Sequence, residues 1–216
     1  MIRKVEKYMR VAVVNEVSAV NKNVDIIQAL EGFGCSVINA GMLNPDDKPE
    51  LTYIHTGLIS ALLLNLDAAD MVVGGCGTGQ GYLNSVMQYP GVFCGLINDP
   101  LDAWLFSQIN GGNCISLPLN KGYGWAGDIN LKYVFEKLFA DEMGAGYPEH
   151  RRESQQESRN RLKQVSAVSH LKMEDILPLM DEKIVNTVFS AEHFIAAVQG
   201  HSKNGLLKEL ILKKYL

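Results

Sequence analysis

The chain of 216 residues lacks any apolar run of the length, about 18–20 residues, that a membrane-spanning helix needs. Positive charge is not in excess either: 20 Lys and Arg stand against 24 Asp and Glu, for a net charge of −4. Proteins that bind nucleic acids or membrane surfaces usually carry the opposite balance. The segment Met1–Lys7 has no signal-peptide core. These absences predict a cytoplasmic protein with no nucleic-acid partner and no membrane partner.

Cysteine is scarce, and the cysteines lack the spacing that metal sites and thiol–disulfide enzymes need. The four cysteines show no Cys-x-x-Cys pattern, and no cysteine or histidine stands at ligand spacing from Cys76. Zinc sites and thiol–disulfide enzymes need such partners, so we expect no metal. Cys35, Cys94 and Cys114 lie in strand-like apolar runs and are expected to be buried small hydrophobes in a reducing compartment. Cys76 differs from them in its setting.

Nucleotide-binding motifs are missing as well. A dinucleotide site needs glycines at i, i+2 and i+5 after a strand, but from Gly75 the third position is Gln80, and from Gly77 it is Tyr82. No Gly-Lys-Ser or Gly-Lys-Thr closes the turn, which excludes a nucleotide-binding phosphate loop. We therefore expect no cofactor.

Short apolar segments alternate with amphipathic ones over the first two thirds of the chain. The strand-like segments are residues 10–15, 35–39, 71–75, 91–97 and 114–117. Strands that alternate with helices of this length are typical of a parallel sheet covered on both faces. We predict an α/β fold, a three-layer sandwich with a five-stranded parallel sheet, in residues 1–145. Residues 146–216 are predicted to be a helical extension packed on this core or on a partner subunit.

The segment 70–100 is the centre of the predicted sheet. It holds a buried strand, a glycine-rich turn, a short helix and a second buried strand, and Cys76 lies in the turn. Backbone N–H groups in such a turn stabilise a thiolate, which can act as a nucleophile or as a general base. Acyl transfer would need a paired histidine, and the central histidine, His55, lies on another segment. Proton abstraction beside a carbonyl needs only one base and donors for an enediolate oxygen.

The run Cys76-Gly77-Thr78-Gly79-Gln80-Gly81 resembles the Cys-Gly-Thr-Gly-x-Gly signature of the type B ribose-5-phosphate isomerase and galactose-6-phosphate isomerase family. The likeness covers about residues 10–140 and includes Tyr53, Pro90-Gly91-Val92, Asn98-Asp99-Pro100, Asn110 and Asn113. It implies a Rossmann-like sheet, a homodimer or higher homo-oligomer with active sites near the subunit interface, and no metal. The implied activity is aldose–ketose isomerisation of a phosphorylated sugar.

Roles follow from the resemblance residue by residue. Cys76 is implied as the base that moves a proton between adjacent sugar carbons, and Thr78 as the residue that assists ring opening. The amides implied to bind the enediolate are those of Gly77, Gly79, Gln80 and Gly81. The residues expected to bind substrate are Asn15, Glu16, Tyr53, His55, Asp99 and Asn110.

The chain departs from the family pattern at three places. After the first strand, where the family commonly has Asp-His, this chain has Asn15-Glu16. Where many members have a histidine, it has Ile109, and in place of Gly-x-Arg it has Pro118-Leu119-Asn120. These changes affect ring opening and recognition of the sugar's far end, so another sugar phosphate or an open-chain substrate is expected. Glu16 or His55 could be the ring-opening acid. Alternatively, Glu16 is solvent-exposed, and His55 is a surface residue or caps a helix.

Phosphate binding would need cations, which the family takes from its C-terminal helix, often in the neighbouring subunit. The candidates here are His150 and four arginines, Arg151, Arg152, Arg159 and Arg161, since the guanidinium fork of arginine matches phosphate oxygens. The alternative is a solvated helix face on which Glu153 and Glu157 pair with these arginines. The sequence thus predicts an isomerase of a sugar phosphate. The alternatives are an isomerase or epimerase of a non-classical sugar, and a sugar-phosphate-binding protein without turnover.

Overall fold

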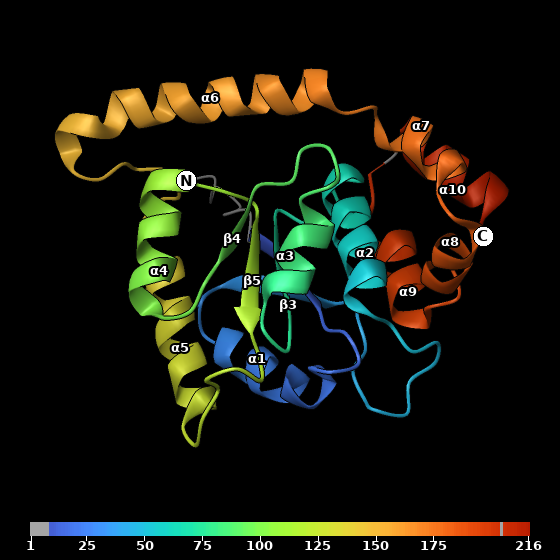
Figure 1. The fold of residues 1–216 in the computed structure, drawn as a ribbon, viewed down its shortest axis with the longest axis horizontal. Helices are drawn as coiled ribbons and strands as arrows, with labels where there is room; N and C mark the ends of the chain where they lie inside the picture. The colour runs from blue at the N-terminus through green and yellow to red at the C-terminus, as the bar shows by residue number, and fades with distance from the viewer. Residues whose placement is uncertain (1–8, 204) are drawn as a thin grey trace, which may run out of the picture.

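The computed structural model describes residues 9–203 and 205–216, so the prediction for Met1–Lys7 lies outside it. Five strands form one parallel sheet in the order β2-β1-β3-β5-β4 (Figure 1). The strands are β1 (Met9–Val14), β2 (Cys35–Asn39), β3 (Met71–Cys76), β4 (Cys94–Leu96) and β5 (Cys114–Pro118). The predicted three-layer Rossmann-like sandwich is confirmed.

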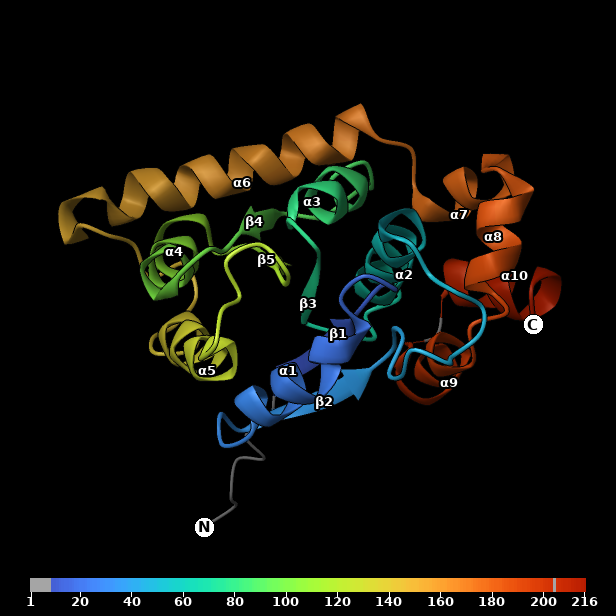
Figure 2. The same cartoon turned by 60° about the horizontal axis from the view of Figure 1, so that its bottom comes forward.

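Helices cover both faces of the sheet, as right-handed parallel crossovers require. In Figure 2, α1 and α5 lie on one side of the sheet and α2 and α3 on the other. The helices of this layered part are α1 (Asn23–Leu30), α2 (Tyr53–Asn65), α3 (Gln80–Val86), α4 (Pro100–Leu105) and α5 (Gly127–Leu138), with the short turns η1 (Val20–Lys22) and η2 (Phe106–Asn110). The turn η2 is π-helical and ends at Gly111.

Each face of the sheet has its own apolar core. Val11, Val13 and Val73 point into the core under α1 and α5, whereas Ala12 and Val72 point into the core under α2 and α3. Side chains alternate between the two faces of a strand, and both faces are covered here, which explains the continuous apolar runs in the sequence. The central strands β1 and β3 are thereby fixed in register.

The predicted second buried strand over residues 91–97 is wrong in extent and burial. β4 has three residues and is half-buried, because it is an edge strand that pairs, among the described residues, only with β5. Cys94 on this strand and Cys35 on the opposite edge strand are partly exposed, so the prediction that both are buried is wrong as well. Cys114, on the inner strand β5, is buried as predicted.

The chain after β5 and α5 is helical. Its elements are η3 (Glu149–Arg151), α6 (Arg152–Ser169), α7 (Met173–Ile176), η4 (Leu177–Leu179), α8 (Glu182–Val188), α9 (Glu192–His201) and α10 (Leu206–Lys214). Helices α8 and α9 contact α2, and Phe194, Val198 and Ile211 join the core on that side of the sheet. Helix α6 instead runs along one edge of the sheet, with Ser166 as its one buried residue (Figure 1). None of the helices in the described ranges is long and apolar enough to cross a membrane.

Candidate active site

Cys76 is the last residue of β3, at the carboxyl end of the sheet, beside Pro118 of β5. It is 7% exposed, and its carbonyl accepts hydrogen bonds from the amides of Gly79 (3.3 Å) and Leu119 (3.0 Å). Gly79 precedes α3 in the left-handed conformation (φ +76°), which glycine adopts without strain. The Ser116 hydroxyl donates to the Gly79 carbonyl (2.6 Å). These contacts fix the thiol at the start of the glycine turn.

The same turn presents hydrogen-bond donors. The backbone N–H groups of Gly77, Thr78 and Gly81 donate to no acceptor within the described part of the chain. The amide of Gln80 donates to the Thr78 hydroxyl (3.3 Å). Amides gathered in this way can stabilise an oxyanion that develops during a reaction. The turn therefore offers a thiol together with three available amide donors.

The chain that leaves β1 brings an acidic side chain to this end of the sheet. Val14 pairs with Gly74, and both Val14 and Cys76 face the core on the α2 side. β1 ends at Val14, and Glu16 lies two residues later, in the loop that leaves the carboxyl end of the strand. Glu16 is 3% exposed, so the alternative of a solvent-exposed glutamate is wrong. The Ser18 hydroxyl donates a hydrogen bond to the Glu16 carboxylate.

The loops after β1 and β5 meet around Gly77. The Asn120 side chain donates to the Ser18 carbonyl (2.8 Å), and the Asn120 amide donates to the Gly77 carbonyl (3.0 Å). The Ser18 hydroxyl oxygen lies 3.6 Å from the position that a Cβ on Gly77 would occupy. Neither Ser18 nor Asn120 was predicted as a site residue. Asn120 could have been found as the residue that replaces a family arginine, whereas Ser18 belongs to no motif.

Asn15 precedes Glu16 and has no solvent exposure. Neither atom of its side-chain amide has a hydrogen-bond partner within the described residues. A buried amide in this state is costly, by about 1–3 kcal/mol, and calls for an explanation such as a ligand or an internal water. Asn15 thus lies at the carboxyl end of β1, and both polar atoms of its side chain are available to bind a ligand or a water molecule.

Tyr53 and His55 stand at the start of α2. The Tyr53 ring lies 3.2 Å from the position of a Cβ on Gly81, so it borders the glycine turn. His55 forms a capping box with Thr52: its Nδ1 accepts from the Thr52 amide (3.0 Å), and the Thr52 side chain bonds back to the helix. Burial lowers the pKa of His55. The capping role considered for His55 is therefore the one that the structure shows.

Asp99 begins α4 at the carboxyl end of β4. Its side chain accepts a hydrogen bond from the Asp102 amide (2.9 Å), and Pro100 occupies the first turn. This is the helix cap that the sequence predicts. Asp99 thus lies at the same edge of the sheet as the glycine turn, with one carboxylate oxygen committed to the helix.

Asn110 lies at the other end of the sheet. It closes η2 just before β5 begins at Cys114, whereas Cys76 stands where β3 ends. Because the strands are parallel, the amino end of β5 and the carboxyl end of β3 lie at opposite ends of the sheet along the strand direction. Figure 1 shows β5 pointing away from the edge along which α6 runs. One protomer therefore does not bring Asn110 to Cys76.

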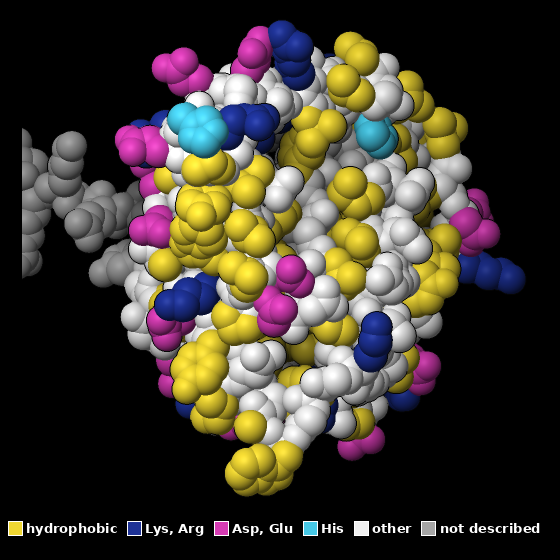
Figure 3. Space-filling model, turned by 60° about the vertical axis from the view of Figure 1, so that its left-hand side comes forward, with side chains coloured by type: hydrophobic (Ala, Val, Ile, Leu, Met, Phe, Trp, Pro, Cys, Tyr) yellow, Lys and Arg dark blue, Asp and Glu magenta, His cyan; other side chains and the backbone are white. Residues whose placement is uncertain are grey.

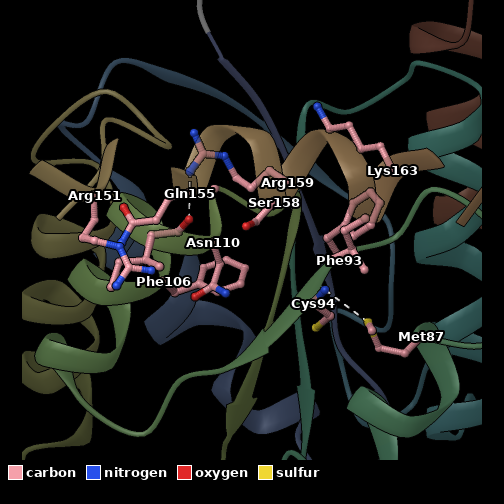
Figure 4. Close-up of a pocket in the computed structure, with 13 residues that line it drawn as sticks. Met87, Phe93, Cys94, Phe106, Asn110, Arg151, Gln155, Ser158, Arg159 and Lys163 are labelled. Carbon is pink, nitrogen blue, oxygen red and sulfur yellow. Dashed lines mark hydrogen bonds between the residues drawn. The ribbon is translucent and has the colours of Figure 1, made fainter. Parts of the chain in front are cut away.

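A cavity of about 360 Å³ lies between α6, η2 and β4 (Figure 4). Phe93 and Phe106 form part of its apolar wall, and Asn110 lies beside them. Arg151, Arg159 and Lys163 supply positive charge from η3 and α6. Figure 3 shows hydrophobic side chains spread over much of this side of the molecule. The cavity combines an apolar wall with cations. It lies near the amino ends of β4 and β5, at the end of the sheet opposite Cys76.

The four predicted phosphate-binding arginines differ in their partners. Arg159 donates to the carbonyls of Ile109 (2.9 Å) and Gly144 (2.7 Å). Arg161 forms an ion pair with Glu157, as in the alternative of a solvated helix face. Arg152 donates to a backbone carbonyl of the preceding loop. Arg151, whose Nε donates to a serine of its own turn, keeps most of its guanidinium available.

Within the described residues, no group of three or more His, Cys, Asp or Glu side chains is arranged to hold a metal ion. The site at the carboxyl edge is instead built from one thiol, one carboxylate, hydroxyls and backbone amides. Such groups can move protons and stabilise negative charge on oxygen.

A sequence model of the Ribose/Galactose Isomerase family matches residues 11–164. Among solved structures, a 4-deoxy-L-threo-5-hexosulose-uronate ketol-isomerase complexed with a tartrate is 38% identical (TM-score 0.91) and covers 95% of this chain and 98% of that chain. A ribose-5-phosphate isomerase from Vibrio parahaemolyticus is 39% identical (TM-score 0.91) and covers 96% and 99%. The type B ribose 5-phosphate isomerase of Leishmania infantum, 17% identical with a TM-score of 0.62, shows the fold alone. No curated protein matches the chain.

The parallel sheet and the cysteine in its glycine turn define a class of sugar isomerases. The family match spans well over half of the chain, and the chain belongs to the Ribose/Galactose Isomerase family. The two relatives near 38% identity match the C-terminal helices too, whereas the Leishmania isomerase covers only 76% of this chain although all of its own length is matched. About a quarter of this chain therefore has no counterpart in the Leishmania isomerase, whereas the former relatives match nearly all of it.

Proposed function

We propose that this chain is an aldose–ketose isomerase that needs no cofactor and works through an enediolate, with Cys76 as the base. The observation that carries this proposal is the turn itself, in which a 7% exposed thiol adjoins three amides that have no acceptor within the described residues. The thiolate takes the proton from the carbon beside the carbonyl, and the amides of Gly77, Thr78 and Gly81 hold the oxygen that becomes negative. The thiol then returns the proton to the adjacent carbon.

We propose an open-chain, anionic sugar acid as the substrate. The name of the hexosulose-uronate relative describes a sugar with a ketone at C5, a carboxylate at C6 and no hydroxyl at C4. Without hydroxyls on C4 and C5, its C1 aldehyde cannot close a furanose or pyranose ring. Such a substrate needs no ring-opening acid, which fits a chain that has Ile109 where the family has a histidine.

The available hydrogen-bond donors also favour a carboxylate over a phosphate. Arg159 donates to two backbone carbonyls, so among the cations that line the cavity Arg151 and Lys163 keep more of their N–H donors available. One guanidinium can bind a carboxylate with two parallel hydrogen bonds, whereas a phosphate dianion is usually met by more donors. A sugar acid therefore needs fewer hydrogen-bond donors from this cavity than a sugar phosphate does.

A phosphorylated sugar is the second candidate. It is favoured by the three cations that line one cavity, Arg151, Arg159 and Lys163, and by the Vibrio relative, whose name specifies ribose 5-phosphate. The two candidates share the enediolate chemistry at Cys76 and differ only in the anionic group at the sugar's far end.

We also propose that a second copy of the chain completes the site. Asn110 and the cationic cavity lie at the edge opposite Cys76, so they can contact a substrate at the thiol only if they come from another copy. A two-fold pair of subunits would bring each cavity to the partner's glycine turn and produce two equivalent sites. The assembly is then a homodimer or a larger homo-oligomer.

A substrate panel tests the proposed function. The purified chain is given 4-deoxy-L-threo-5-hexosulose uronate, ribose 5-phosphate and galactose 6-phosphate, and isomerised product is measured by NMR. We expect kcat/KM for the uronate to exceed that for either phosphate by at least about 100-fold, the discrimination expected of sites built around a substrate's polar groups. Preference for a phosphate would select the second candidate. Binding without turnover of any of the three would overturn the isomerase proposal.

A further inference from the structure

We propose that Glu16 is a second proton-transfer group of the isomerisation, which carries the hydroxyl proton between the two oxygens of the enediolate while Cys76 moves the carbon-bound proton. This inference rests on the proposed function above.

The first observation is the placement of the side chain. Glu16 follows β1, whose last residue Val14 pairs with Gly74 of β3. Its carboxylate accepts from the Ser18 hydroxyl, whose oxygen lies 3.6 Å from the position of a Cβ on Gly77, the residue after Cys76. Adjacent strands in a sheet are about 4.8 Å apart, so a bound sugar fragment can touch both groups. A carboxylate and a thiol then face the same pair of substrate carbons and oxygens.

The second observation is the way in which the carboxylate is held. Ser18 donates to one of its oxygens, and the other oxygen accepts no hydrogen bond within the described residues. The Asn120 side chain in turn donates to the Ser18 carbonyl, and the backbone N–H of Asn120 donates to the Gly77 carbonyl. Glu16 is therefore oriented by the same contacts that shape the oxyanion-binding turn, and one carboxylate oxygen stays available for a proton.

The third observation is that His55 and Asp99, the imidazole and the second carboxylate considered for this site, are engaged in helix caps. His55 uses Nδ1 to cap α2, and Asp99 uses a carboxylate oxygen to cap α4. The Thr78 hydroxyl accepts from the Gln80 amide and is not acidic. Glu16 is 3% exposed, and such burial of a carboxylate without an ion pair is costly and typical of a functional group.

The proton balance of the reaction explains why such a group is needed. Cys76 as thiolate removes the C2 proton of the aldose, and the electrons form a C1=C2 double bond while O1 becomes negative. Glu16 as carboxylate takes the proton from O2 and passes it to O1. As O2 becomes the ketone oxygen, C1 takes the proton from the Cys76 thiol. Both side chains end as they began, and no oxidant, reductant or co-reactant enters.

The test separates the two proton transfers with Glu16→Gln in deuterated water. The amide cannot carry a proton, so isomerised product should fall by at least about 100-fold, the usual contribution of general acid–base catalysis. Cys76 can still remove and return the C2 proton, so deuterium should enter the recovered aldose within about tenfold of the wild-type rate. The ratio of exchange to isomerisation therefore rises, a change that a merely structural role would not produce.

Matched variants complete the design. Glu50→Gln makes the same change at an exposed glutamate and should leave both rates unchanged. Glu16→Asp should restore part of the isomerisation, and Ser18→Ala should raise the exchange-to-isomerisation ratio even if Glu16→Gln does not fold. Isomerisation by Glu16→Gln at the wild-type rate, or an equal fall in both rates, would overturn the inference. Loss of wild-type exchange with every substrate would instead overturn the proposed function, so the two failures are distinguishable.

Discussion

Gly74, two residues before the proposed base, shows how little space the sheet leaves behind Cys76. A Cβ on Gly74 would lie 2.1 Å from Cζ of Tyr82, whose hydroxyl is 2.7 Å from the Ser60 hydroxyl. Tyr82 is fully buried, so it cannot move aside without breaking this contact. The glycine thus keeps α3, and with it the glycine turn, close to the sheet.

Gly74→Ala should lower the free energy of unfolding by about 1–3 kcal/mol, because the added methyl group overpacks a full core. Urea unfolding followed by circular dichroism measures this change. The matched control is Gly200→Ala, where a Cβ meets nothing within 4 Å and the helix should be unchanged or slightly stabilised. Equal stability of the two variants would contradict the packing described here.

Single residues differ in how far the sequence predicts them. The Cys76 turn and the Asp99 cap are local patterns, and such patterns can be recognised from spacing alone. The burial of Glu16 is not local, because it depends on the loops that carry Ser18 and Asn120, the latter more than 100 positions away in the chain. The neighbours that decide its environment are therefore absent from any window of sequence around it.

Among the elements, the start of α2 combines a structural cap with a titratable group. His55 accepts from the Thr52 amide through Nδ1 and must be neutral to do so. Burial lowers the pKa of His55 below its ordinary value of 6.5, so the unfolded chain binds a proton more readily than the folded one. The resulting stability is present above about pH 6.5 and is lost as the pH falls through the folded pKa.

His55→Gln should therefore flatten the pH dependence of stability, because glutamine can complete a capping box but does not titrate. We expect the wild type to lose more free energy of unfolding than His55→Gln between pH 7 and pH 5, as measured by urea titrations at each pH. Identical profiles for wild type and His55→Gln would contradict the capping role.

The C-terminal helices are bound to the layered part through buried aromatic packing. Phe194 on α9 is fully buried and packs edge-on against Phe189, with ring centroids 5.6 Å apart. Its core is continuous with that of α2. The division of the chain at residue 145 stays a prediction, and cooperativity of unfolding provides a test of it.

Phe194→Ala should lower the free energy of unfolding by about 3–5 kcal/mol, the usual cost of removing a buried phenylalanine. Of the two tryptophans, Trp125 is fully exposed, so the fluorescence change on unfolding comes from the partly buried Trp104 on α4, in the layered part. A single unfolding unit requires the tryptophan transition to shift in Phe194→Ala but not in Leu179→Ala, where the side chain is exposed. An unchanged tryptophan transition in Phe194→Ala would show that the extension unfolds separately.

Element order was predictable because strands and helices alternate with clear apolar runs, and the five-stranded parallel sheet follows from them. The short, half-exposed β4 was not predictable in the same way. Its sequence is apolar, but its pairing with β5 alone decides how much of it is a strand. The π-helical turn η2, which places Asn110, is likewise set by packing and by the left-handed Gly111 that ends it.

For the whole molecule, the central feature is that Cys76 and the cavity beside Asn110 lie at opposite ends of the parallel strands. If a second copy completes each site, the variants Cys76→Ala and Asn110→Ala should complement one another. A mixed dimer holds one site in which an intact Cys76 meets an intact Asn110 from the other copy. Sites within one protomer could not be restored in this way.

Subunits of the two inactive variants, mixed by co-expression, should therefore recover about a quarter of wild-type activity, since half of the dimers are mixed and each has one intact site. The assay is isomerisation of the best substrate from the panel. Each variant alone, expressed in the same way, is the control. Activity of the mixture no greater than that of either variant alone would contradict shared sites.

The most direct test of the proposed chemistry is deuterium incorporation from solvent at the carbon beside the substrate carbonyl. The wild type should incorporate deuterium, and Cys76→Ala should do so at least about 100-fold more slowly, because the turn then keeps its amides but has no base. Cys76→Ser should be similarly slow, since a hydroxyl is a poor base at neutral pH. Incorporation at the wild-type rate in Cys76→Ala would contradict the assignment of Cys76 as the base.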